Sequence, residues 1–137
     1  MDKTPNKIQI PGKTRIAVKI MTIYSSILFL ILFMVAFFSW ELGMQEIITA
    51  RMFDYIWAFF MLLLYFMSAR MLLGGIYLSW NLAVFLLTIM AIGSLVQTFI
   101  GSISYVFGFL GNTIPLSLLL LDRKNYFAEI EKAKKKN

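Results

Sequence analysis

Residues 71–121 read MLLGGIYLSWNLAVFLLTIMAIGSLVQTFIGSISYVFGFLGNTIPLSLLLL and contain no aspartate, glutamate, lysine or arginine. As one helix, the part from residue 74 to residue 121 would extend about 70 Å, more than twice the roughly 30 Å of a bilayer's hydrocarbon core. The stretch must therefore turn back once. We predict membrane-spanning helices at 77–100 and 103–121, joined at Gly101-Ser102.

Two further spans are predicted before this stretch. Residues 20–40 are uncharged and end at Trp40, a residue type typical of the membrane–water interface. Asp54 begins the next span, 54–73, because an acid in the first turn faces unpaired backbone N–H groups. Gly74-Gly75 then allows a tight reversal. The predicted fold is all-α: a polytopic four-helix transmembrane bundle covering residues 20–121.

The charged residues gather at the two ends of the chain. In a four-span arrangement, twelve of the thirteen basic residues fall on the side that holds both tails. Arg51 falls opposite, in the segment 41–53, which is expected to be a short interfacial helix or a solvated loop. The positive-inside rule places both basic tails, 1–19 and 122–137, in the cytoplasm. We therefore predict a multi-pass protein of the cell membrane, of the prokaryotic inner or plasma membrane type.

Composition argues against most catalytic chemistry. The chain has no cysteine and no histidine, which excludes disulfides, thiol catalysis and imidazole acid–base roles. It shows no phosphate-binding glycine loop, nucleophile elbow or metal-ligand spacing. We expect no enzyme, no catalytic residue, no cofactor and no metal. The basic residues flank apolar spans, which fits anionic lipid headgroups at the cytoplasmic face and not nucleic acid.

A few polar side chains fall inside the predicted spans. Arg70 is expected to snorkel to the headgroups; binding an anionic group or pairing with Asp122 are the alternatives. Gln97 in the third span, and Asn112 with Thr113 in the fourth, are expected to form interhelical hydrogen bonds. The alternative role for these three is a polar pathway for a solute, which would require an oligomer to assemble a ring.

The fourth span carries a stripe of small residues and a proline. Ser104, Gly108 and Asn112 recur at four-residue spacing, with Gly111 beside them, so another helix of the bundle or of a second copy can approach closely. Pro115 removes a backbone donor and should bend the helix, freeing the carbonyl of Gly111. Asn112 and the threonine after it are expected to help satisfy that carbonyl.

The second tail is predicted to be an amphipathic helix that extends the fourth span along the membrane. Tyr126, Phe127 and Ile130 fall on one helical face, which would contact lipid or dock a cytoplasmic partner. Lysines near the end of the chain would anchor this helix to anionic lipids: Lys134, Lys135 and Lys136.

The third span opens with Ser79-Trp80-Asn81-Leu82-Ala83, and the fourth closes with four leucines followed by Asp122-Arg123-Lys124-Asn125-Tyr126-Phe127. From about residue 15 to residue 127, this layout resembles the small four-span prokaryotic integral membrane proteins of unknown function. The resemblance implies the four-helix fold and no activity. In place of the usual basic turn before the tryptophan, this chain has the uncharged segment 74–79.

Three hypotheses on function follow from these observations. The first is a non-enzymatic accessory or interaction subunit that contacts a membrane protein partner through helix packing and its cytoplasmic tail. The second is a small oligomeric transporter or channel built from copies of this chain. The third is an immunity-type protein that protects its host membrane from a toxic peptide.

Overall fold

The computed structural model describes residues 9–43, 52–100 and 105–135. These residues form four α-helices: α1 (Gly12–Glu41), α3 (Met52–Leu72), α4 (Tyr77–Ile100) and α5 (Tyr105–Lys135). Each helix is long and apolar enough to cross a membrane. The prediction of an all-α fold is therefore confirmed, and so is the prediction of four helices with the length and apolar composition of membrane spans. The predicted turn at Gly101-Ser102 and most of segment 41–53 lie outside the described residues.

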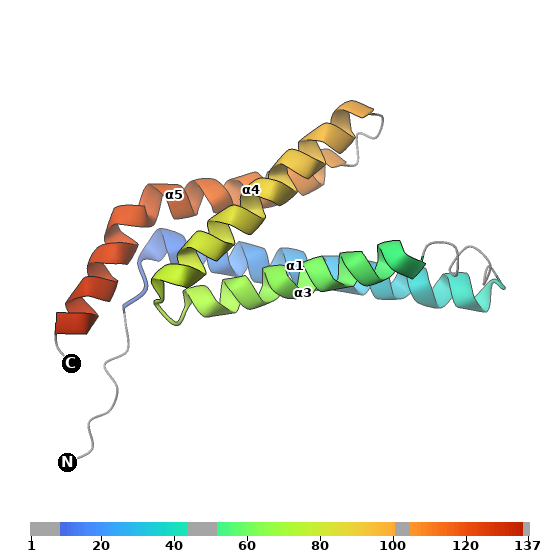
Figure 1. Cartoon of the computed structure of the whole chain (residues 1–137). Helices are drawn as coiled ribbons and strands as arrows, with labels where there is room; N and C mark the ends of the chain where they lie inside the picture. Colours follow the sequence, from blue (N-terminus) through green and yellow to red (C-terminus); the bar gives the residue numbers. More distant parts are fainter. Residues whose placement is uncertain (1–8, 44–51, 101–104, 136–137) are drawn as a thin grey trace, which may run out of the picture.

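The helix ends follow local backbone chemistry. α1 begins at Gly12, earlier than the predicted residue 20, and Pro11 before it has the non-helical ψ of 151° of an N-cap position. α3 ends at Leu72, and Gly75 adopts a φ of +66°, a left-handed conformation that glycine reaches without a steric penalty. α5 continues without a break through Pro115 to Lys135, and it curves along its length (Figure 1).

The helices form two hairpins, α1 with α3 and α4 with α5. Each helix contacts the next along the chain, and α5 returns to contact α1, which closes the ring. The start of α1, the turn between α3 and α4 and the end of α5 lie together at what we call the tail end (Figure 1). From there the two hairpins diverge toward the opposite end, the open end.

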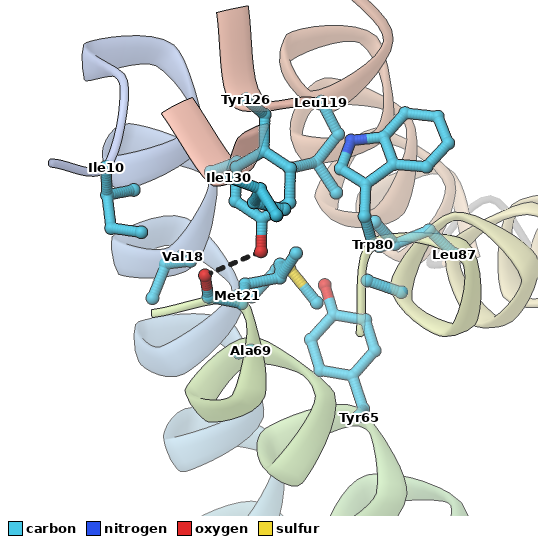
Figure 2. Close-up of a cluster of buried hydrophobic side chains, with 13 residues drawn as sticks. Ile10, Val18, Met21, Tyr65, Ala69, Trp80, Leu87, Leu119, Tyr126 and Ile130 are labelled. Carbon is cyan, nitrogen blue, oxygen red and sulfur yellow. Dashed lines mark hydrogen bonds between the residues drawn. The ribbon is translucent and has the colours of Figure 1, made fainter. Parts of the chain in front are cut away.

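The buried residues extend from the tail end as far as Ser25 in α1, Leu62 in α3, Ala91 in α4 and Asn112 in α5, and we call this part of the bundle the tail half. Figure 2 shows side chains from all four helices meeting there, among them Met21, Tyr65, Leu87, Leu119 and Tyr126. In the open half, none of the described residues is buried. This holds for each helix in turn: residues 26–43, 52–61, 92–100 and 105–111.

Candidate functional site

A carboxylate from α5 caps the first turn of α1 at the tail end. Asp122 Oδ2 accepts hydrogen bonds from the backbone N–H of Thr14 at 2.8 Å and from its hydroxyl at 3.0 Å. Pro11, at the N-cap position, makes no side-chain hydrogen bond to this turn. An acid 108 residues later in the chain therefore supplies the acceptor. Its negative charge faces the positive end of the helix dipole.

Tyr126, one turn further along α5, supplies a hydrogen-bond donor to the last turn of α3. The Tyr126 hydroxyl donates to the carbonyl of Leu72 at 2.9 Å, in the last turn of α3 (Figure 2). A tyrosine hydroxyl is protonated at neutral pH, so it can donate this hydrogen bond. Thr14, Asp122, Tyr126 and Leu72 together form what we call the tail-end clasp. It fixes α5 to both helices of the first hairpin.

The clasp changes the expected role of the second tail. Tyr126 and Ile130 were predicted to face lipid or a cytoplasmic partner, but they are 0% and 2% exposed and pack in the chain's own core. The reason is that α5 curves at the tail end (Figure 1), so Tyr126 and Ile130 belong to the core cluster of all four helices. Phe127 is half-buried, Lys134 and Lys135 are exposed, and Lys136 lies outside the described residues.

Tyr126→Phe tests the hydroxyl of the clasp. The variant leaves the carbonyl of Leu72 without this donor, so we expect the free energy of unfolding to fall by about 1–2 kcal/mol. Reversible unfolding in mixed detergent micelles measures the change. Tyr105→Phe, which removes a hydroxyl from an exposed residue, is the matched control and should change little. Equal effects of the two variants would contradict the role given to Tyr126.

Arg70 does not pair with Asp122. It is exposed in the last turn of α3, with its guanidinium carbon 5.5 Å from the ring centroid of Phe66, while Asp122 is 2% exposed and bonded to Thr14. The predicted alternative of an Arg70–Asp122 pair is therefore wrong in this structure. Snorkelling of Arg70 to headgroups stays a prediction, to which its exposure at a helix end lends support.

The three polar side chains of the third and fourth spans do not form one path. Gln97 is exposed on α4, whereas Asn112 is 1% exposed. The Asn112 amide nitrogen donates to the carbonyl of Gly108 at 2.6 Å, one turn back in the same helix and not to the carbonyl of Gly111. Within the described residues, the Asn112 amide oxygen and the Thr113 hydroxyl have no hydrogen-bond partner.

The small residues of α5 admit a tyrosine ring from α1. A Cβ built on Gly111 would lie 2.7 Å from Cε2 of Tyr24, and one on Gly108 would lie 3.1 Å from the Ser94 hydroxyl. The stripe thus allows α1, α4 and α5 to pack closely. Ser104, its first predicted member, lies outside the described residues. Pro115 is buried in the same helix.

Sequence reasoning missed Thr14, Asp122 and Tyr24 as structural partners. Two signals were available for the first pair: a Pro-Gly helix start without a capping side chain, and a single acid directly after a leucine run. Neither signal says that the two ends meet. Tyr24 gave no signal at all, because a tyrosine within an apolar span is compatible with any helix face.

Two apolar grooves lie mostly in the open half of the bundle. One, of about 510 Å³, lies between α1 and α3. The other, of about 580 Å³, lies between α1, α3 and α4, where the hairpins begin to diverge. Its lining is almost entirely aliphatic and aromatic and includes Ile31, Val35, Ala58, Ile89 and Met90. We call this second cavity the inter-hairpin groove.

No protein-family model, curated protein or solved structure matches this chain. In residues 9–43, 52–100 and 105–135, no group of three or more acidic side chains that could hold a metal ion is present. Of the surfaces described above, the inter-hairpin groove and the tail end are the candidates for contacts with other molecules.

Proposed function

We propose that this chain is a non-enzymatic, multi-pass subunit of the cell membrane that binds a transmembrane helix of another membrane protein in its open half. The observation that carries the proposal is the one-sided core. All four helices bury side chains in the tail half, and none of their described residues is buried in the open half. The clasp holds the hairpins together at one end, and the hairpins diverge toward the other (Figure 1).

The apolar lining of the inter-hairpin groove favours a helix as its occupant. Helices associate in a bilayer through close van der Waals packing, because lipid tails are as apolar as the side chains they would replace. A partner helix in the inter-hairpin groove would contact α1, α3 and α4 at the same time. On the outside of the bundle, exposed apolar residues would face lipid. A partner helix there would not contact three helices at once.

The basic tails set the proposed orientation. Lys13, Arg15 and Lys19 of α1 and Lys134 and Lys135 of α5 are exposed at the same end of the bundle. By the positive-inside rule, this end faces the cytoplasm and the open end faces the other side of the membrane. The partner helix would therefore pack in the half of the bilayer away from the cytoplasm.

A transport function has less support. Gln97 is exposed while Asn112 is buried and bonded to its own helix, so the two do not line one polar surface of the monomer. If copies of this chain did form a conduit, Asn112→Leu and Gln97→Leu would lower solute or ion flux into liposomes. No specific observation favours an immunity-type role.

Filling the inter-hairpin groove tests the proposal. Ala58→Phe adds a ring where the partner helix would pack, and overpacking costs about 1–3 kcal/mol. We expect about tenfold or greater loss of the stoichiometric partner recovered with the tagged protein from its own membranes. Leu95→Phe, at an exposed position of α4, is the control and should leave recovery unchanged. Recovery that is equal for both variants would contradict the groove as the binding site.

A further inference from the structure

Three aromatic rings meet at the tail end where α4 begins. Tyr77 and Trp80 lie one turn apart on α4, and Phe127 of α5 packs against both, with ring centroids 4.9 and 5.2 Å away. Tyrosine and tryptophan are typical of the membrane–water interface. Four leucines, 118–121, precede this part of α5 directly. The three rings, which we call the aromatic platform, therefore lie at the boundary between apolar span and basic tail.

Two cationic side chains from α5 lie over the platform. The Arg123 guanidinium carbon is 5.5 Å from the ring centroid of Trp80 and 5.7 Å from that of Phe127. The Lys134 ammonium nitrogen is 4.8 Å from the ring centroid of Tyr77. Stacking on a ring restrains a long side chain without using its N–H donors. Both residues are exposed, so these donors are available to a ligand.

Within the described residues, the acids of α5 form no ion pair with Arg123 or Lys134. Each acid has another hydrogen-bond partner: Asp122 with Thr14, Glu129 with Lys132 and Glu131 with Tyr77. The one ion pair among the described residues is Lys132–Glu129, at 2.7 Å. Arg123 and Lys134 therefore have N–H donors free for an external anion, beside further exposed basic residues of the tail end.

We propose that the aromatic platform, with Arg123 and Lys134, binds the phosphate groups of anionic phospholipids. A guanidinium presents paired N–H donors that match phosphate oxygens. The rings beneath it give the less polar part of the headgroup an apolar surface. The depth of the site, directly after the leucine run, is that of the headgroup layer. This site is at the tail end and does not depend on a partner helix in the open half.

The test compares two charge-matched double variants of the full-length protein in vesicles of phosphatidylcholine with phosphatidylglycerol. R123Q/K134Q removes both cations of the platform. K124Q/K135Q removes two exposed cations of the same helix. Native mass spectrometry reports the phosphatidylglycerol that stays bound. We expect the affinity to fall about 25-fold for the first variant, from about fivefold for each charge, and to fall far less for the second.

A third variant removes the ring and keeps every charge. Phe127→Leu should also lower phosphatidylglycerol retention, because Arg123 loses one of the two rings beneath it. Equal losses from the two double variants, or an unchanged Phe127→Leu, would show only diffuse surface charge and overturn the site. Release of bound lipid from the wild type by inorganic phosphate would overturn the assignment to a phospholipid.

Discussion

Gly111→Ala is expected to lower the free energy of unfolding by about 1–3 kcal/mol. The added methyl group would lie 2.7 Å from Cε2 and 2.9 Å from Cζ of Tyr24. That ring cannot move aside freely, because it packs edge-on against Tyr65, with 6.1 Å between centroids, and Tyr65 is fully buried. Relief of the overlap therefore requires α1 and α5 to separate.

The matched control is another helical glycine of the same chain. Gly93 in α4 has no atom within 4 Å of a Cβ built on it. Gly93→Ala should leave stability unchanged or raise it by up to about 1 kcal/mol, since alanine is the better helix former. In a Tyr24→Ala background the penalty of Gly111→Ala should disappear, because the overlapping ring is gone. Equal effects of the two glycine variants would contradict the close approach of α1 and α5.

Asp122→Ala should cost about 2–3 kcal/mol of unfolding free energy. It removes a charged acceptor that bonds both the N–H and the hydroxyl of Thr14, and leaves that buried hydroxyl without its partner. Unfolding in mixed micelles measures the loss. Amide hydrogen exchange should also quicken in the first turn of α1, because the cap is gone.

Asp54→Ala provides the comparison for Asp122. Asp54 is also an acid at a helix start, but it lies exposed in the first turn of its own helix, α3. Its removal should cost at most about 1 kcal/mol, through the helix dipole alone. If Asp122→Ala were no more costly than Asp54→Ala, the contact between α5 and α1 would contribute nothing to stability.

Gly111→Ala and Asp122→Ala both test contacts between α5 and α1. The clasp and the core lie in the tail half of the bundle, and the contact of Gly111 with Tyr24 lies where the tail half meets the open half. The open half is held by contacts within each hairpin, such as that between Phe29 and Phe59, whose ring centroids are 5.5 Å apart. The chain can therefore be stable through one half of its length while the other half remains available to a partner.

The sequence predicts the helices well because membrane spans depend on local properties. The uncharged run 71–121 is too long for one span, and Gly74-Gly75 is a natural reversal, so two of the four helices follow from length and composition. The positions of helix ends are harder to predict. α1 extends back to Gly12 because an acid from the far end of the chain caps it, and no local pattern contains that information.

The amphipathic face of the second tail shows a similar limit. The spacing of Tyr126 and Ile130 predicts that they share a covered face, and the structure buries both. The periodicity does not say what covers them, and here the chain's own tail half does so. The divergence of the hairpins was also beyond prediction, because bulky apolar side chains in a span read alike whether they face lipid or another helix.

The most direct test of the central claim is site-specific photo-crosslinking from α4 in native membranes. A photoreactive side chain at Ile89, in the inter-hairpin groove, should give one discrete adduct with another membrane protein. The same group at Leu95, about 120° away around the helix, should give lipid adducts only. Ala58→Phe should abolish the Ile89 adduct. Lipid adducts alone from both positions would contradict a partner helix in the open half of the bundle.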